Sequence, residues 1–178
     1  MAKKINKELS MHGHARVDPW YWLNQREDTA VLNYLEAENA YTESMTAHTA
    51  ALRESLYQEL VGRIEQNEVS APYSLNGFSY YSLYEEGQEY PLYLRKALHG
   101  DTSEQVLLDL PSMAQGHAYY EVTGLSISHN NRYLAFGVDE VSRRQYTIMI
   151  KDLQTGKLLD DRMPNTNGNA VWASDHRT

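Results

Sequence analysis

The chain has 178 residues, with 16 Lys and Arg against 24 Asp and Glu, a net charge of −8 and a mean hydropathy of −0.63. No run approaches the ~18 apolar residues of a membrane-spanning helix, and the basic start is followed by polar residues instead of the apolar core of a secretory signal. The acidic balance argues against nucleic acid and mildly favours cationic partners. We therefore expect a cytoplasmic protein that binds neither nucleic acid nor membrane.

Residue spacing excludes the common catalytic and phosphate-binding motifs. No two of the ten glycines lie two, four or five positions apart, which excludes G-x-G-x-x-G, the G-x-S-x-G nucleophile elbow and the Walker loop. The absence of cysteine excludes thiolate metal sites and cysteine nucleophiles. His12 and His14 could offer two imidazoles to a metal ion, but no H-E-x-x-H motif or nearby carboxylate accompanies them. We assign no catalytic, cofactor-binding or metal-ligating residue in this chain.

Residues 1–27 are predicted to form an extended N-terminal arm. The segment is polar until Trp20, Tyr21, Trp22 and Leu23, which a flexible tail would not carry. Because Trp and Tyr bury large areas, this cluster is expected to dock the arm against a core, the alternative being a ligand-binding cluster.

Residues 28–72 are predicted to form a helical hairpin. The first helix covers roughly 29–47, where Asp28 or Thr29 can cap the first turn. The second carries apolar residues at i, i+4 spacing and extends to about Gln66. These residues are Leu52, Leu56, Leu60 and Ile64. The stripe predicts packing onto the chain's own core, and a coiled-coil interface with a partner is the alternative.

Residues 73–178 change to aromatic and β-branched runs separated by turns, which predicts strands. Phe78–Tyr84 and Tyr90–Arg95 form a hairpin around a glycine-containing turn. We place a first β-propeller blade at about 76–110, with a loop inserted around Leu98–Glu104.

An internal repeat supports the propeller prediction. At an offset of 56 residues, Gln88–Arg95 superposes on Arg144–Lys151, with the apolar alternation and a tyrosine in common. Repeats of ~40 to 50 residues built of short strands are typical of propeller blades. A second blade is predicted at about 125–162, with strands at Leu125–Ser128, Tyr133–Val138, Gln145–Asp152 and Lys157–Arg162.

A third copy is expected to start at 170–178. At an offset of 45 residues, Trp172–Thr178 resembles Ile127–Tyr133, with a turn and then an arginine in each. Because two blades and a partial third would leave strand edges exposed, we expect an N-terminal fragment of a longer protein. The alternative is a small β-sheet domain.

The sequence resembles the prolyl oligopeptidase family of serine peptidases over nearly its whole length, and within it looks most like the oligopeptidase B branch. The residues that carry the resemblance are Arg16–Asp18, Tyr21–Leu23, Tyr34–Thr42, Gly62–Ile64, Pro72–Tyr73, Tyr80–Tyr81, Glu85–Gly87, Tyr90–Pro91, Gly116–His117, Arg143–Tyr146 and Lys151–Leu153. Two departures are Pro19, where the family often has an acidic residue, and Asn130-Asn131 in place of Asp-Gly at the blade turn. Asn accepts the left-handed conformation, so that turn should survive.

The resemblance implies a mostly β fold with N-terminal helices, in which this chain supplies the first blades of a seven-bladed propeller. The propeller would cap an α/β-hydrolase domain whose Ser, Asp and His triad lies beyond Thr178. It also implies hydrolysis of short peptides after Arg or Lys, by carboxylates outside this chain. The part in hand would pack on the catalytic domain and gate substrate access.

Two other functions stay open from the sequence. A propeller-type protein-binding module without catalysis would not need ~70 residues of aromatic arm and helices before its first blade, and the repeat signature of scaffold propellers is missing. An independent dimerising domain would have to close its sheet edges through its partner.

Overall fold

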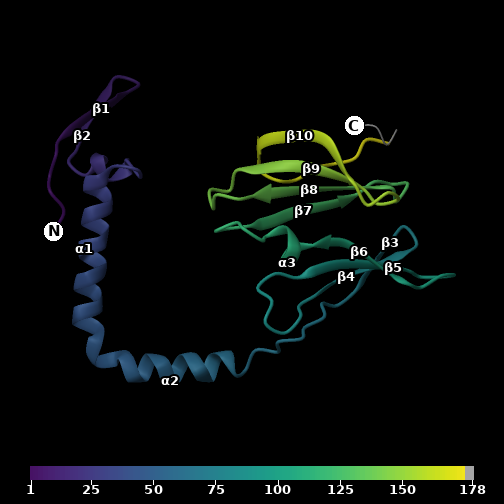
Figure 1. Cartoon of the computed structure of the whole chain (residues 1–178). Helices are drawn as coiled ribbons and strands as arrows, with labels where there is room; N and C mark the ends of the chain where they lie inside the picture. The colour runs from purple at the N-terminus through teal and green to yellow at the C-terminus, as the bar shows by residue number, and fades with distance from the viewer. Residues whose placement is uncertain (175–178) are drawn as a thin grey trace. The chain divides into compact units, whose positions relative to one another are not determined.

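A computed structural model describes residues 1–174, and the chain divides into two units, Met1–Ile64 and Glu65–Thr178 (Figure 1). The first unit contains β1 (Lys7–Met11), β2 (His14–Asp18), η1 (Tyr21–Asn24), α1 (Thr29–Thr46), η2 (Ala47–Thr49) and α2 (Ala50–Val61). The second contains β3 (Tyr73–Leu75), β4 (Phe78–Leu83), β5 (Leu92–Ala97), β6 (Glu104–Asp109), α3 (Leu110–Met113), β7 (Glu121–Ile127), β8 (Tyr133–Asp139), β9 (Tyr146–Asp152) and β10 (Leu158–Thr166).

The N-terminal segment folds into a β-hairpin, where the sequence had predicted an extended arm over 1–27. His12 and Gly13 form the two-residue turn between β1 and β2, and both have positive φ, 53° and 79°. That conformation matches the twist of paired strands and so closes the hairpin. Trp22 donates its indole N–H to the Lys3 carbonyl at 2.8 Å and contacts the Tyr34 ring of α1 edge-on at 6.0 Å. The aromatic cluster therefore anchors the segment to α1.

Both predicted helices are present, but they do not pack as a hairpin. Asp28 caps α1 by accepting the Ala30 backbone N–H at 2.7 Å. The 3-10 turn η2 then leads directly into α2, so the helices run in different directions instead of side by side (Figure 1). The second helix ends at Val61, short of Gln66. A hairpin needs a loop that reverses the chain, and the three residues of η2 continue a helical path instead.

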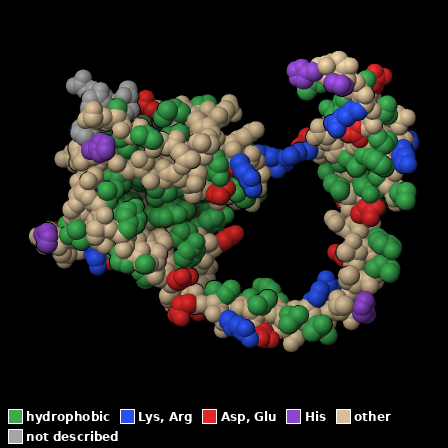
Figure 2. All heavy atoms as spheres, turned by 180° about the vertical axis from the view of Figure 1, so that it is seen from behind, with side chains coloured by type: hydrophobic (Ala, Val, Ile, Leu, Met, Phe, Trp, Pro, Cys, Tyr) green, Lys and Arg blue, Asp and Glu red, His purple; other side chains and the backbone are tan. Residues whose placement is uncertain are grey.

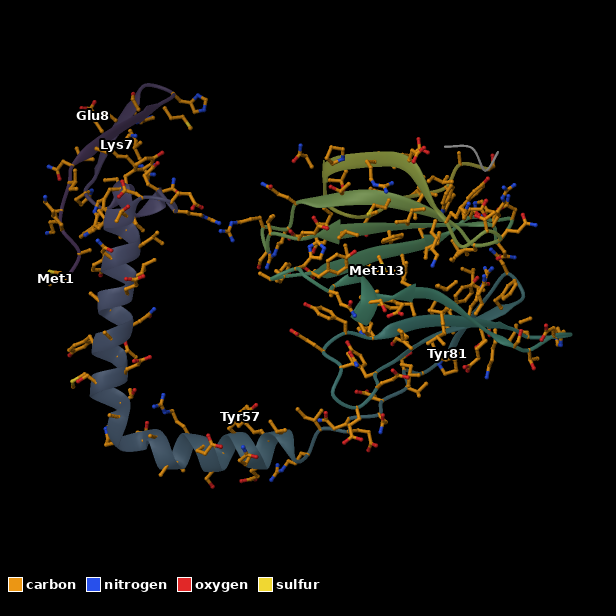
Figure 3. The ribbon with its side chains drawn as sticks, in the orientation of Figure 1. Met1, Lys7, Glu8, Tyr57, Tyr81 and Met113 are labelled. Atoms are coloured by element: carbon orange, nitrogen blue, oxygen red, sulfur yellow. The ribbon has the colours of Figure 1, made fainter. Side chains whose placement is uncertain are left out.

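As a result, the apolar stripe of α2 is exposed within its unit. Leu52, Leu56, Leu60 and Ile64 are 48% to 61% exposed, and Figure 2 shows hydrophobic side chains on the surface of the helices. Tyr57 projects outward from the same helix and is also exposed (Figure 3). A row of exposed apolar side chains is a candidate contact surface.

The second unit consists of two four-stranded antiparallel sheets, with strand orders β3-β4-β5-β6 and β10-β9-β8-β7. In each sheet, consecutive strands are neighbours, which is the meander of a propeller blade. The first sheet includes Tyr73–Leu75 ahead of the predicted start at 76, and residues 98–103 form the loop between β5 and β6. The second sheet has its strands at the four predicted places, and β7 and β10 are longer than expected.

The two sheets bury one shared core between them. Leu108 of the first sheet and Leu134 and Phe136 of the second are completely buried. The cluster also contains Tyr80, Leu107, Leu110, Tyr120, Val138 and Leu153. Each sheet thus buries one face against the other, which a single sheet of this size cannot do alone.

The side-chain register corrects the predicted repeat. Arg95 pairs in register with the core residue Tyr80, and Lys151 pairs with the core residue Leu134. Arg95 therefore faces the second sheet and Lys151 faces the first. The 56-residue offset aligns Arg95 with Lys151 and would make both side chains point toward the next blade. They point toward each other's sheet instead. Because a one-residue slip exchanges the faces of a strand, the predicted alignment is wrong by one residue.

The segment after β10 lies across the second sheet. A Cβ on Gly137 would come within 2.4 Å of the Gly168 Cα, and one on Gly124 within 2.0 Å of the Gly168 carbonyl oxygen. Trp172 stacks on Tyr133 at 6.0 Å and donates its indole N–H to the β7 backbone. Residues 170–174 form no strand, and the remainder of the third blade predicted at 170–178 lies outside the described residues.

Two buried aspartates organise the turns of the second sheet. Asp139, 1% exposed, accepts the backbone N–H groups of Val141, Arg143 and Arg144 at 2.7 to 2.9 Å. Burial raises the pKa of the Asp139 carboxyl, but these bonds outweigh it and hold the pKa below the ordinary 3.8. Asp152 accepts two bonds from the Arg132 guanidinium, and its pKa is likewise lowered although burial acts in the opposite direction.

We predict that the free energy of unfolding falls as the pH is lowered, and that Asp139→Asn reduces the steepness of this fall. A carboxyl whose pKa is lower in the folded state stabilises the fold above its unfolded pKa, and this contribution is lost as the pH falls through the folded pKa, below about pH 4 to 5. Urea unfolding of the full protein between pH 7 and pH 3 measures the slope. The variant should be less stable at pH 7 by about 1 to 3 kcal/mol and fall less steeply.

The matched control is Asp160→Asn on the exposed face of β10. It should follow the unsubstituted protein at every pH. Equal slopes for Asp139→Asn and the unsubstituted protein would contradict the role given to this carboxylate.

Candidate functional site

Four connecting segments gather at one end of the two sheets. Because the strands alternate in direction, the β4–β5 turn (84–91), the β6–β7 connection (110–120) and the β8–β9 loop (140–145) all lie at this end. The chain also leads into the first sheet here, since the Tyr84 N–H donates to the Glu68 carbonyl at 2.8 Å. Loops at the end of a rigid sheet scaffold are where binding residues concentrate.

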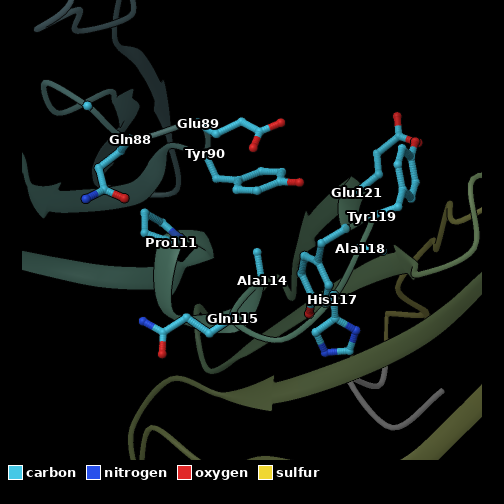
Figure 4. Close-up of a pocket in the computed structure, with 12 residues that line it drawn as sticks. Gln88, Glu89, Tyr90, Pro111, Ala114, Gln115, His117, Ala118, Tyr119 and Glu121 are labelled. Carbon is cyan, nitrogen blue, oxygen red and sulfur yellow. The ribbon is translucent and has the colours of Figure 1, made fainter.

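An open pocket of about 580 Å³ lies between two of these segments, the β4–β5 turn and the β6–β7 connection (Figure 4). Its walls come from the β4–β5 turn, which supplies Glu89 and Tyr90, and from the β6–β7 connection, which supplies His117 and Tyr119. Glu121 follows at the start of β7. No Lys or Arg lines the pocket, so its charged side chains are carboxylates.

Glu121 is held in place by two tyrosines. Its Oε2 accepts the hydroxyl of Tyr119 at 2.6 Å and that of Tyr146 at 2.8 Å. The hydrogen bond to Glu121, followed by burial and the charge of that carboxylate, raises the pKa of Tyr146 to about 12. The hydrogen bond that Tyr119 donates to the same carboxylate is the largest cause that raises the pKa of Tyr119. Both phenols therefore remain neutral donors that fix the carboxylate at neutral pH.

The imidazole of His117 extends the polar wall. Its Nδ1 lies 3.7 Å from Glu140 Oε1, and its ring centroid lies 5.1 Å from that of Tyr120. Beyond it, the β8–β9 loop presents the exposed Arg143 and Arg144 on a backbone that Asp139 holds. Arg144 has φ 55°, an uncommon conformation for a residue other than glycine.

The arrangement is suited to binding and orienting a cation, and its described lining residues offer no nucleophile paired with a base. A fixed carboxylate, a second carboxylate and aromatic rings are what an ammonium or guanidinium group needs. Sequence reasoning missed Glu121 and Tyr146 as a pair, because they lie 25 residues apart. Tyr146 had been singled out through the repeat, and Glu85-Glu86-Gly87 had marked the neighbouring turn as part of the resemblance.

The two histidines weighed as metal ligands lie apart from this pocket along the chain. His12 is in the β1–β2 turn and His14 begins β2. Among residues 1–174, no group of three or more His, Cys, Asp or Glu side chains is placed to hold a metal ion. That the two histidines bind no metal stays a prediction.

Comparison with known proteins agrees with the propeller sheets. The family described as prolyl oligopeptidase, N-terminal beta-propeller domain, matches residues 1–178. Dipeptidyl aminopeptidase BI from Pseudoxanthomonas mexicana is 40% identical over an alignment 195 positions long, which covers 100% of this chain and 27% of that protein. Protease 2 from Moraxella lacunata is 37% identical, over 97% of this chain and 26% of its own length.

A solved structure extends the similarity to three dimensions. Oligopeptidase B from Leishmania major superposes with a TM-score of 0.86 at 27% identity, over 98% of this chain and 27% of that one. The chain thus spans about a quarter of the length of these relatives. With the family matched along the whole chain and the blade architecture in place, this protein belongs to the prolyl oligopeptidase family, whose N-terminal β-propeller region it represents.

Proposed function

We propose that the full protein is a cytoplasmic serine oligopeptidase that hydrolyses short peptides after Arg or Lys, and that this part gates access to a catalytic domain. The family and the similarity to oligopeptidase B and Protease 2 support a peptidase. The observation that carries the substrate class is the pocket with Glu89 and Glu121 and without a cationic side chain. No helix in the described part of the chain is long and apolar enough to cross a membrane.

The chemistry would be that of a Ser, His and Asp triad contributed from beyond Thr178. In such a triad, histidine takes the serine proton, aspartate orients the imidazole, and backbone amides stabilise the oxyanion. This chain would supply binding. The Glu121 carboxylate, fixed by Tyr119 and Tyr146, is ready to pair with a basic side chain of a peptide without reorganising.

Gating follows from where the pocket lies in the sheets. The loops around it are at the end where the chain leads into the first blade, and this is the end that we assign to the catalytic domain. A propeller over an active site admits short or extended peptides and excludes folded proteins. We expect no nucleic-acid partner, because the pocket attracts cations and the chain carries a net charge of −8.

The catalytic domain would also cover the helices of the first unit. Leu52, Leu56 and Leu60 of α2 and Ile64, which follows the helix, are apolar and exposed. Burial of one such aliphatic side chain stabilises a contact by about 1.5 to 3 kcal/mol, so the four side chains together would attach the first unit firmly to the catalytic domain. This contact would hold the propeller to the catalytic domain on one side while its loops move.

The names of the relatives indicate different cleavage specificities, and one experiment distinguishes among these specificities for the full protein. We expect the full protein to cleave fluorogenic amides after Arg or Lys at least tenfold faster than after Pro or an acidic residue. A serine-reactive phosphonate should label it and abolish turnover. Substrates with blocked and free N-termini, compared at equal length, separate oligopeptidase activity from the aminopeptidase activity named for the Pseudoxanthomonas relative.

A full protein that neither reacts with the phosphonate nor cleaves any of these substrates would contradict the proposal and favour a propeller-type binding module. The 178-residue chain by itself is expected to be inactive, since it has no nucleophile elbow.

Glu121→Gln should selectively weaken the binding of substrates with a basic side chain. Loss of one charge-assisted contact raises KM for Arg substrates about three- to tenfold, while kcat stays within about twofold. Steady-state kinetics on an Arg amide and on a neutral amide of equal length measure the difference. The control is Glu86→Gln in the β4–β5 turn, which removes an equal charge at the same end of the sheets but outside the pocket lining. Equal effects of the two substitutions would mean that only overall charge matters.

Leu56→Asp should destabilise the full protein by placing a carboxylate in the proposed contact with the catalytic domain. The expected loss is about 2 to 4 kcal/mol in unfolding free energy, with faster proteolysis of the first unit. The control is Gln58→Asp, an exposed position on the same helix whose side chain bonds Glu54. If both variants are equally stable, the stripe does not lie in an interface.

A further inference from the structure

At the opposite end of the sheets, a buried arginine lies without a carboxylate partner. Arg95 of β5 is 5% exposed, and its guanidinium lies over the Phe78 ring at 4.3 Å from the centroid. Its Nε donates to Gln105 Oε1 at 2.8 Å and its Nη1 to the Asn131 carbonyl at 3.0 Å. Both acceptors are neutral. Within residues 1–174, Arg95 takes part in no ion pair.

A buried charge of this kind needs compensation. Arginine is rarely buried to this extent unless it is paired, because removing an ion from water costs several kcal/mol. A guanidinium has five N–H donors, and the two bonds of Arg95 to Gln105 and Asn131 leave others to be satisfied. The ring of Phe78 offsets part of the cost through its π face and accepts no bond in the plane of the fork.

The guanidinium borders an open pocket of about 420 Å³ between the two sheets. The β7–β8 turn supplies Asn130, Asn131 and Arg132, and the β9–β10 turn supplies Gln154. No Asp or Glu lines this pocket, although the chain as a whole is acidic. The nearby Arg132 is already neutralised by Asp152, at 2.9 Å. The uncompensated charge in the pocket is therefore that of Arg95.

The geometry points to an oxyanion site in which Arg95 binds a carboxylate or phosphate group between the first two blades, with Asn130, Arg132 and Gln154 of the two turns around it. Arginine presents a planar fork that matches two oxygens of such a group. One fork and neutral donors give a dissociation constant on the order of 1 mM. The site lies at the end of the sheets away from the acidic pocket, so it is separate from peptide recognition.

Saturable stabilisation of the full protein by inorganic phosphate tests the site. At pH 7 and constant ionic strength, the thermal midpoint should rise with phosphate and level off in the millimolar range. A second arm with acetate tests whether a monocarboxylate is sufficient. General salt effects of phosphate rise without saturation, so saturation distinguishes binding from them. Phosphorus NMR line broadening on the same samples reports contact directly.

Gln154→Glu is the informative variant, because Arg95 itself belongs to the packed interface and its replacement endangers folding. Gln154 is an exposed turn residue, and a carboxylate there supplies the counter-charge from within the chain. We expect a higher midpoint without phosphate and an affinity for phosphate at least tenfold weaker. Gln88→Glu adds the same charge at the other end of the sheets and should bind phosphate as the unsubstituted protein does.

The absence of saturation with both anions would overturn the proposal, and Arg95 would then act in sheet packing alone. An identical phosphate response in Gln154→Glu and Gln88→Glu would also overturn it. The readouts are independent of peptidase activity, so the result does not depend on the function proposed above.

Discussion

The stacking of two antiparallel sheets is the constraint on which the rest of the second unit depends. A single sheet cannot bury its own apolar face and needs another layer packed on it. The completely buried Leu108, Leu134 and Phe136 accordingly come from both sheets. Polar bonds fix how the sheets sit. Lys151 donates to the Leu107 carbonyl and Gln105 to the Leu153 carbonyl, both at 2.7 Å. Burial lowers the pKa of Lys151, whose ammonium group is partly removed from water between the sheets.

Once the faces are committed to stacking, the strand ends are the places left for function. Antiparallel meanders put alternate connections at opposite ends, and the pockets at the two ends differ in the charge of their linings. Glu89 and Glu121 line the pocket at one end, and Arg95 borders the pocket at the other. The residues that line the pockets therefore lie at the ends of the strands, and the residues that form the core lie along the faces of the same sheets.

The sequence predicted the strands well, because alternation and turn residues are local. All four strands of the second blade lie where the pattern indicated, and Asp28 caps its helix as expected. It predicted the hairpin of helices wrongly, since the i, i+4 stripe of α2 specifies an apolar face and not what covers it. It could not place the Arg95 and Lys151 side chains, because a repeat aligned on tyrosines leaves the register free by one residue.

The candidate sites needed tertiary contacts for the same reason. Glu121 and Tyr146 are separated by 25 residues, and Arg95 and Asn131 by 36, with no local signal to join them. What the sequence did contain was the residue types: an acidic turn at 85–87 and a basic residue ending a strand at Arg95. Arg95 belongs both to the packing of the sheets and to a candidate site. Its bond to the Asn131 carbonyl crosses from the first sheet to the β7–β8 turn of the second, so whatever compensates its charge also stabilises the stacking on which both pockets rest.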